Sequence, residues 1–210
     1  MSRKISLYLL LIILLGIAIY SSFNIKSYFS STHESMEDIG CYYLTDVDMG
    51  LLKDRSFKIL IIEMDEITEK DVSTLHNSNK LILAYIDFGF AEKWRDYWPS
   101  ISNSSLVHRE SMYEDEYYIE FWQIKWKNII LSEADKAFKM GFDGVFLDNV
   151  DVCIILNESK PTWINDLNIT RLVIDSIYNL SNTLKMEYET EFKVFVNIAL
   201  HIIYSTIIDS

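Results

Sequence analysis

The sequence has few of the residues that build disulfide frameworks and metal centres. It contains two cysteines, Cys41 and Cys153, and four isolated histidines among its 210 residues. Two cysteines make no disulfide framework, and no histidines and cysteines have the spacing of a metal site. A glycine-rich phosphate loop is absent, which disfavours a nucleotide-binding fold. The sequence therefore predicts neither a cofactor nor a bound metal.

Basic residues are also scarce. The chain has 19 lysines and arginines against 31 acidic residues, a net charge of -12. Three of the basic residues, Arg3, Lys4 and Lys26, lie in the first thirty positions, so the rest of the chain carries 16 basic and 31 acidic groups. This balance argues against nucleic acid or anionic lipid as a partner of the globular part. It suits a cationic substrate through electrostatic steering, although acidic surfaces also serve solubility alone.

The amino terminus carries the one long apolar run. Residues 5–20 are apolar or small except for Ser6, and Arg3 and Lys4 precede them. This pattern predicts a signal anchor, a transmembrane helix over residues 1–23 that leaves the rest of the chain outside the cytoplasm. A cleavable signal peptide is the alternative. The polar, serine-rich residues 24–39 then form a linker to a domain over residues 40–210.

Strand and helix patterns alternate through this domain. Such alternation predicts an α/β fold in which crossover helices connect parallel strands. A helical turn is expected at residues 91–98 and a loop at residues 100–118. Strands are expected at residues 41–44, 57–65, 81–87, 145–147 and 192–198, and helices at residues 67–77, 126–140 and 167–188.

Acidic residues follow several of the predicted strands. Asp87 ends one strand, and Asp148 and Asp151 follow another. The carboxyl ends of parallel strands face the ligand crevice. Carboxylates beside aromatic rings such as Tyr85 and Trp122 are typical of a carbohydrate cleft, where a carboxylate pair performs the chemistry. In the alternative interpretation the acids cap the helices that follow, and the tryptophans belong to the core.

Three segments of the chain resemble one known family. Residues 83–98 (LAYIDFGFAEKWRDYW), 120–130 (EFWQIKWKNII) and 141–151 (GFDGVFLDNVD) are similar in order and spacing to segments of the endo-α-1,4-polygalactosaminidase-like proteins, glycoside hydrolase family 114. The resemblance implies a TIM barrel that cleaves α-1,4-linked galactosamine polymers, which are cationic when deacetylated. It implies that Asp148 is the catalytic carboxylate, with Asp87 or a group outside this chain as its partner. The residues expected to bind the substrate are Tyr85, Glu92, Trp122, Asp151 and Asn197.

The chain also departs from the family pattern. Phe90 stands where the family usually has glutamate, and Asp87 stands where serine is common. No glutamate follows Asn197, although the family pattern places a second carboxylate on a later strand. The exported region of about 185 residues is shorter than the ~250 residues of a full barrel. These departures predict an incomplete barrel, with either a homodimer that covers its open edge or a marginally stable domain. They leave a non-catalytic carbohydrate-binding protein or degenerate hydrolase as the alternative function.

Overall fold

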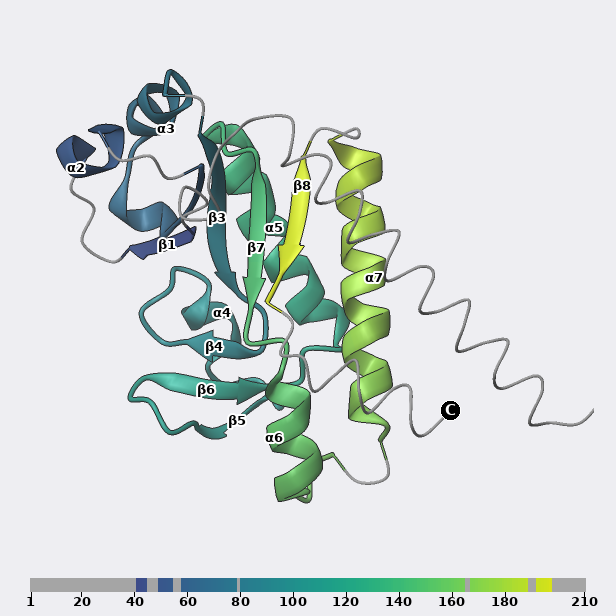
Figure 1. Ribbon diagram of the computed structural model, residues 1–210. Helices are drawn as coiled ribbons and strands as arrows, with labels where there is room; N and C mark the ends of the chain where they lie inside the picture. Colours follow the sequence, from purple (N-terminus) through teal and green to yellow (C-terminus); the bar gives the residue numbers. More distant parts are fainter. Residues whose placement is uncertain are drawn as a thin grey trace, which may run out of the picture. The chain divides into compact units, whose positions relative to one another are not determined.

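Figure 1 shows the computed structural model of the chain. It describes residues 41–44, 49–54, 58–78, 80–164, 167–188 and 192–197. The predicted transmembrane helix at residues 1–23 and the linker at residues 24–39 lie outside these ranges. No helix within the described ranges combines the length and the apolar character that crossing a membrane requires.

A parallel sheet of five strands forms the centre of the fold. Its order is β1-β2-β3-β7-β8, and every neighbouring pair is parallel. This confirms the α/β class with a parallel sheet. Strands β1 and β8 are the edges of the sheet in the described part of the chain, so the closed barrel stays a prediction. The strands are β1 Cys41–Leu44, β2 Ile59–Ile62, β3 Leu81–Asp87, β7 Gly144–Asp148 and β8 Lys193–Val196.

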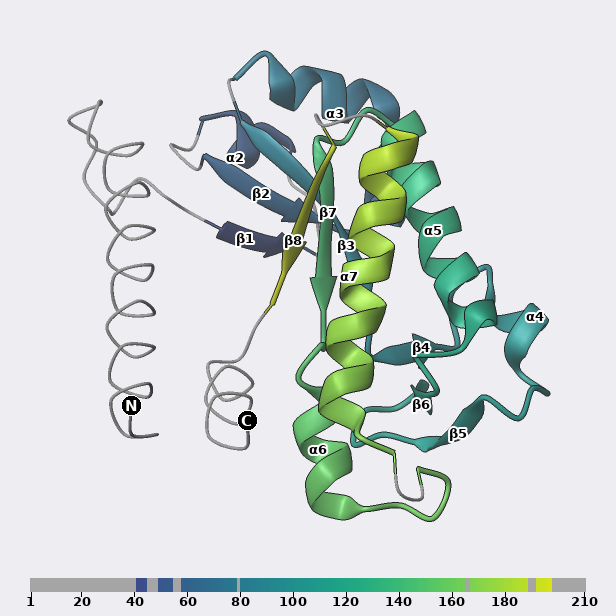
Figure 2. The same cartoon turned by 90° about the vertical axis from the view of Figure 1, so that its right-hand side faces the viewer.

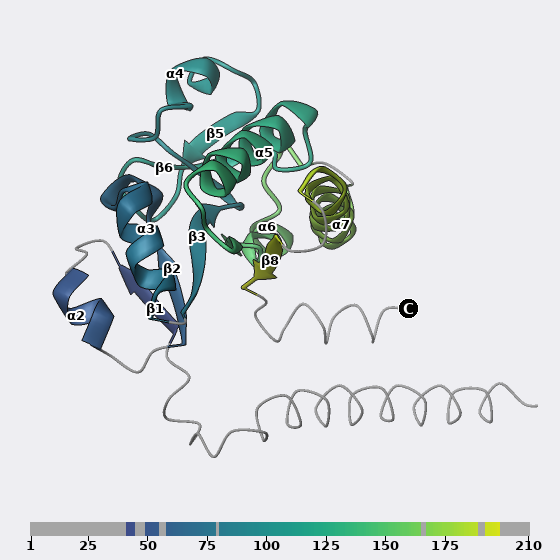
Figure 3. The same cartoon turned by 90° about the horizontal axis from the view of Figure 1, so that it is seen from above.

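Helices cover one face of this sheet. Helices α3 (Glu69–His76), α5 (Ile124–Lys139) and α7 (Ile169–Glu187) lie on the same side in the view from above (Figure 3). Alternate residues of β3, namely Ile82, Ala84 and Ile86, point into the core beneath the helices. Because side chains alternate along a strand, Tyr85 and Asp87 lie on the opposite face. A short helix, α2 (Met49–Asp54), follows β1.

Helix α5 shows why the helices lie on the sheet. Its buried residues are Trp126, Ile130, Ala134 and Ala137, which recur every three or four positions and form one apolar stripe. Gly141, with φ of +87°, turns the chain into β7 directly after this helix.

A second, antiparallel sheet lies beyond the carboxyl ends of β3 and β7 (Figures 1 and 2). Its order is β4-β6-β5, with β4 at Phe90–Glu92, β5 at Val107–Glu110 and β6 at Glu116–Ile119. The predicted helical turn at residues 91–98 and loop at residues 100–118 are therefore wrong. Strands of three or four residues are too short to show a periodic pattern, and pairing with distant residues forms them. The helix α4 (Trp98–Ile101) begins later than expected and accommodates Pro99 in its first turn, where the missing N–H costs no hydrogen bond.

Two further short elements follow strand ends. A single 3-10 turn, η2 (Met64–Glu66), follows β2 and precedes α3. Thr68 and Asp71 cap the amino terminus of α3 with reciprocal hydrogen bonds. Helix α6 (Val152–Ser159) follows β7.

Candidate active site

The two predicted catalytic carboxylates end neighbouring strands at the same level. Asp87 and Asp148 are register partners in the parallel pair of β3 and β7, and each is the last residue of its strand. The backbone N–H of Phe88 donates to the carbonyl of Asp148 at 3.1 Å and extends the pairing by one residue. The structure therefore brings the two acids together at the carboxyl edge of the sheet, where α/β folds place their ligands.

Asp87 is buried and accepts three hydrogen bonds. Its Oδ1 accepts the backbone N–H groups of Gly89 (3.0 Å) and Phe90 (2.9 Å), and its Oδ2 accepts from the side-chain amide of Asn149 (2.7 Å). The side chain is only 4% exposed. Burial and the negative charge of Glu92 raise the pKa of Asp87 well above its ordinary value, and the hydrogen bonds from Phe90 and Asn149 oppose this rise in part. Asp87 thus anchors the turn that follows β3.

Asn149 fixes this turn against the end of β7. Its backbone has φ of +56°, the left-handed region that asparagine tolerates better than most residues. A Cβ atom at Gly89 would lie 2.1 Å from the carbonyl oxygen of Asn149, so only glycine fits there. The amide of Asn149 and the missing side chain at Gly89 together let the two strand ends approach closely.

Asp148 is half-buried and has one fixed oxygen. Its Oδ1 accepts from the side-chain amide of Asn197 at 2.6 Å. The backbone N–H of Asn197 donates to the carbonyl of Leu147 at 2.9 Å, which places Asn197 beside the end of β7. No donor in the described part of the chain binds the second oxygen of Asp148. Among these residues, the second oxygen of Asp148 is thus left for a substrate or a water molecule to contact.

Arg95 binds the two acidic residues that follow β2. It is 5% exposed, and its guanidinium binds both oxygens of Glu63 and lies 3.5 Å from Asp65. Its Nε donates to Glu92 Oε2 at 2.7 Å. Burial raises the pKa of Glu92, and Arg95 opposes this rise. Glu63 and Asp65, which the sequence places at a strand end, thus serve an internal ion pair.

Glu116 is an acidic residue that the sequence analysis did not identify. It begins β6, and it lies opposite Glu92 in the antiparallel pair of β4 and β6. Burial raises the pKa of Glu116, and the charge of Asp148 adds to the rise. The run of β-forming residues from Tyr117 to Ile119 is the one signal in the sequence that predicts a strand at this position.

The model of glycoside hydrolase family GH114 matches residues 42–202. The chain belongs to this family. The resemblance expected from three short segments is thereby confirmed.

Two solved structures share the fold of this family member. The glycoside hydrolase domain of PelA from Pseudomonas aeruginosa has a TM-score of 0.57 and 18% identity, with 80% of this chain and 62% of that domain covered. Ega3 of Aspergillus fumigatus, solved in complex with galactosamine, has a TM-score of 0.60 and 22% identity, with 80% and 61% covered. An uncharacterized protein of Methanocaldococcus jannaschii is 29% identical over 133 residues, which are 58% of this chain and 38% of that protein. The family member thus spans about three-fifths of these solved domains and under two-fifths of this curated relative.

Two other residues predicted to bind the substrate in this GH114 chain, Tyr85 and Asp151, lie close in sequence to Asp87 and Asp148. Tyr85 is on β3 two residues before Asp87 and on the same face of the sheet. Asp151 is the N-cap residue of α6, but its side chain makes no capping hydrogen bond. Asp151 lies three residues after Asp148. Its role as a binding residue stays a prediction.

Trp122 lies against other aromatic rings. Its ring contacts Phe121 at 4.9 Å and stacks near Trp163 at 6.1 Å, measured between ring centroids. It also lines a cavity of about 240 Å³ formed by Phe88 and by residues of α5, α7 and the segment before α5. None of the carboxylates lines this cavity. The hydrogen bond from Trp126 Nε1 to the carbonyl of Phe88 (2.9 Å) fixes the adjoining wall. The structure therefore places Trp122 in an aromatic cluster.

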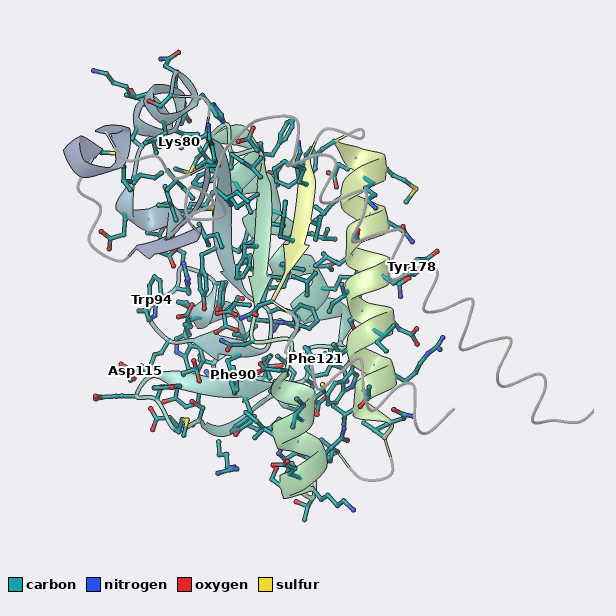
Figure 4. All side chains as sticks on the ribbon, viewed as in Figure 1. Lys80, Phe90, Trp94, Asp115, Phe121 and Tyr178 are labelled. Carbon is teal, nitrogen blue, oxygen red and sulfur yellow. The ribbon has the colours of Figure 1, made fainter. Side chains whose placement is uncertain are left out.

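Aromatic rings also support the turn after β3. Figure 4 shows Phe90 and Phe121 beneath the ends of β3 and β7. Phe90 packs edge-on against Tyr118 at 5.1 Å, and Phe121 packs against Phe88 at 5.5 Å. The family usually has glutamate where this chain has Phe90, and here the position is 6% exposed and apolar. Within the described ranges, no group of three or more His, Cys, Asp and Glu side chains has the geometry of a metal site.

Proposed function

We propose that this family member hydrolyses a galactosamine-containing polysaccharide, with Asp148 as its central carboxylate. The observation that carries the proposal is the position of Asp148 in a GH114 chain. It lies half-buried at the carboxyl edge of the sheet, level with Asp87. One of its oxygens is fixed by Asn197, and the other has no donor among the residues that the structure describes. Glycoside hydrolysis needs such a carboxylate, together with a second carboxyl group 5–5.5 Å away in retaining enzymes or roughly 6.5–9.5 Å away in inverting ones.

The proposed substrate follows from charge. Asp87 and Asp148 lie at one strand edge, and Glu92 and Glu116 lie opposite each other in the small sheet beyond it. The whole chain carries a charge of -12. Protonated amino groups of galactosamine are attracted to such a surface. Ega3 has been solved with galactosamine, which agrees with this chemistry for a fold relative.

The proposed location follows from the sequence of the amino terminus. The apolar run at residues 5–20 behind Arg3 and Lys4 would anchor the chain in a membrane, and the linker at residues 24–39 would hold the domain at residues 40–210 outside the cytoplasm. Fractionation of cells with protease added from outside tests this placement. We expect the full chain in the membrane fraction with its domain digested, and a protected chain contradicts the topology.

The proposed assembly is a homodimer that covers the edge strand β8. Strand β8 pairs only with β7 among the described strands, and an uncovered edge invites pairing with another chain. Sedimentation of the purified full chain in detergent at several concentrations tests it. A monomer at every concentration contradicts the dimer.

A second candidate function is binding of the polysaccharide without cleavage. The observation that favours it is the environment of Asp87. Its three hydrogen bonds and its burial hold the predicted partner of Asp148 inside a turn, and proton transfer from this position requires the turn to open.

Release of reducing ends from a partly deacetylated galactosamine polymer separates the two functions. We expect the wild-type chain to release them and Asp148→Asn to abolish release while it still binds the polymer. Asp175→Asn is the matched control, because Asp175 forms an exposed pair with Arg171 on α7. Polymer binding without cleavage by the wild type favours the binding function and contradicts hydrolysis.

A further inference from the structure

A cavity of about 240 Å³ lies between two of the helices that cover the main sheet. Helices α5 and α7 lie side by side (Figures 2 and 3), and both of them line the cavity together with the turn after β3. Ile124, one of the lining residues, is 67% exposed, so the cavity opens to solvent. Its volume is below the roughly 300–1,000 Å³ of pockets for drug-sized ligands, so it suits a ligand of one ring.

Packing and a hydrogen bond fix the aromatic side of this cavity. Trp126 is fully buried, its Nε1 donates to the carbonyl of Phe88 at 2.9 Å, and Tyr97 packs edge-on against its ring at 5.3 Å. Phe88 also packs against Phe121 at 5.5 Å. Trp122, which is half-buried, completes this side of the cavity. Because these rings are already held in place, a ligand orders few side chains when it binds.

The other side of the cavity is polar and carries one positive charge. Lys127 on α5 and Ser176 and Asn179 on α7 line it. Within the described ranges, these three side chains form no hydrogen bond or ion pair with other residues. Lys127 is the one charged residue among the described residues that line the cavity, although the whole chain carries a charge of -12. The cavity therefore differs in charge from the acidic strand edge of Asp87 and Asp148.

We propose that this cavity is a second sugar-binding site, which takes an N-acetylated hexosamine residue with its ring against Trp122 and its acetyl carbonyl hydrogen-bonded to Lys127. The inference rests on the proposed function, because a partly deacetylated galactosamine polymer contains both charged and N-acetylated residues. It assigns the charged residues to the acidic strand edge and the N-acetylated residues to the cavity.

The chemistry of an N-acetylated sugar matches both sides of the cavity. The C–H faces of the sugar ring and the acetyl methyl group are apolar and gain from contact with aromatic side chains. The acetyl carbonyl accepts from an ammonium group, and the sugar hydroxyls can donate to and accept from Ser176 and Asn179. Removal of the acetyl group replaces a neutral amide with an ammonium group, which Lys127 repels. The acetyl group thus decides which of the two sites a sugar residue enters.

Fluorine NMR of the labelled full chain in detergent tests the site. The chain has five tryptophans, so fluorotryptophan gives one resonance for each, and single Trp→Phe substitutions assign them. We expect N-acetylgalactosamine to shift the resonances of Trp122 and Trp126 and to leave that of Trp94, which lies against Arg95 and does not line the cavity. Galactosamine at the same concentration should leave Trp122 and Trp126 unshifted. No shift with N-acetylgalactosamine, or an equal shift with galactosamine, overturns the proposal. Larger shifts with galacturonic acid than with N-acetylgalactosamine also overturn it, because they indicate an anionic ligand.

Substitution of Lys127 tests the selection by charge. We expect Lys127→Glu to weaken binding of N-acetylgalactosamine by about 2- to 10-fold, the effect of one lost hydrogen bond, and to let galactosamine shift Trp122. Lys185→Glu is the matched control, because Lys185 is an exposed lysine of α7 that does not line the cavity. If Lys127→Glu does not fold, Lys127→Met should weaken N-acetylgalactosamine binding in the same way. Unchanged binding of both sugars by a folded Lys127 variant contradicts the role of this lysine.

Substitution of Ser176 tests the position of the site. Ser176→Phe places a ring in the cavity, so we expect it to abolish the shifts from N-acetylgalactosamine. The same variant should bind a partly deacetylated polymer more weakly than the wild type and a fully deacetylated polymer equally well. Circular dichroism and thermal unfolding establish that the variant is folded. Wild-type shifts in a folded Ser176→Phe chain overturn the assignment to this cavity.

The outcomes distinguish this inference from the proposed hydrolysis, because the sugar titration requires no cleavage. Shifts of Trp122 and Trp126 by N-acetylgalactosamine in a chain that cleaves no polymer overturn hydrolysis and leave the second site standing. Cleavage of the polymer by a chain whose tryptophan resonances do not respond to the sugar overturns the second site and leaves hydrolysis standing.

Discussion

Asn149 bridges the ends of two parallel strands by donating its side-chain amide to Asp87 at 2.7 Å from a left-handed backbone conformation. Asn149 directly follows Asp148, and Asp87 is the register partner of Asp148 on β3, so the contact joins the ends of the two strands. The shape of the candidate site thus depends on a strained residue and on the glycine packed against it.

Substitution of Asn149 separates the hydrogen bond from the backbone conformation. Asn149→Gly keeps the left-handed φ but loses the hydrogen bond to a carboxyl group, which is worth about 1.5–3 kcal/mol. Asn149→Ala loses the same bond and adds about 1–2 kcal/mol of backbone strain. We expect urea unfolding to rank stability as wild type, then Asn149→Gly, then Asn149→Ala. Equal stability of the two variants contradicts the role of the backbone conformation.

Gly89→Ala tests the close approach of the two strand ends. A Cβ atom at this position would lie 2.1 Å from a backbone oxygen that cannot move without displacing Asn149. We expect a loss of about 1–3 kcal/mol of unfolding free energy from overpacking. Gly141→Ala is the comparison, because its nearest neighbour would be 3.9 Å away and only the φ of +87° opposes it. A Gly89→Ala variant as stable as the wild type contradicts the described packing.

The buried guanidinium of Arg95 is expected to dominate the stability of the strand ends. Arg95→Met leaves Glu63 and Glu92 without their partner, and removal of one member of a buried ion pair costs about 3–5 kcal/mol. Arg171→Met is the control, because its exposed pair with Asp175 is worth about 0.3–0.5 kcal/mol. Chemical denaturation measures both. Similar losses of unfolding free energy in the two variants contradict the expectation that the buried ion pairs of Arg95 dominate the stability of the strand ends.

The sequence predicts β3 and β7 well because their apolar runs and terminal acids are local features. It predicts from the same features that Asp87 and Asp148 meet at one edge, and the register of the two strands agrees. The α/β class and the alternation of the main strands with helices follow in the same way.

The small sheet could not be read from local patterns. Strands β4, β5 and β6 have three or four residues, and β4 is stabilised by pairing with β6 across 24 to 28 residues of chain. The position of Glu116 opposite Glu92 depends on that pairing. The burial of Asp87 depends likewise on Asn149, 62 positions away, so residue type alone could not distinguish a free carboxylate from a turn anchor.

The stability of the domain should fall as pH rises above about 4. The pKa of Asp87 is raised in the folded chain by burial and by Glu92, whereas in the unfolded chain it is about 3.9. The folded chain therefore holds this proton more tightly, and unfolding free energy is lost between pH 4 and the raised pKa of Asp87. Asp87→Asn should flatten this dependence and Asp175→Asn should not. A wild-type stability that increases over this range contradicts the account.

The most direct measurement is the release of reducing ends from a partly deacetylated galactosamine polymer by wild-type and Asp148→Asn chains of equal fold and equal polymer binding. Our account predicts release by the wild type and by Asp175→Asn, and none above background by Asp148→Asn. Release that Asp148→Asn leaves unchanged, or a wild type that binds the polymer without cleaving it, contradicts the proposal that Asp148 is the central carboxylate of a glycoside hydrolase.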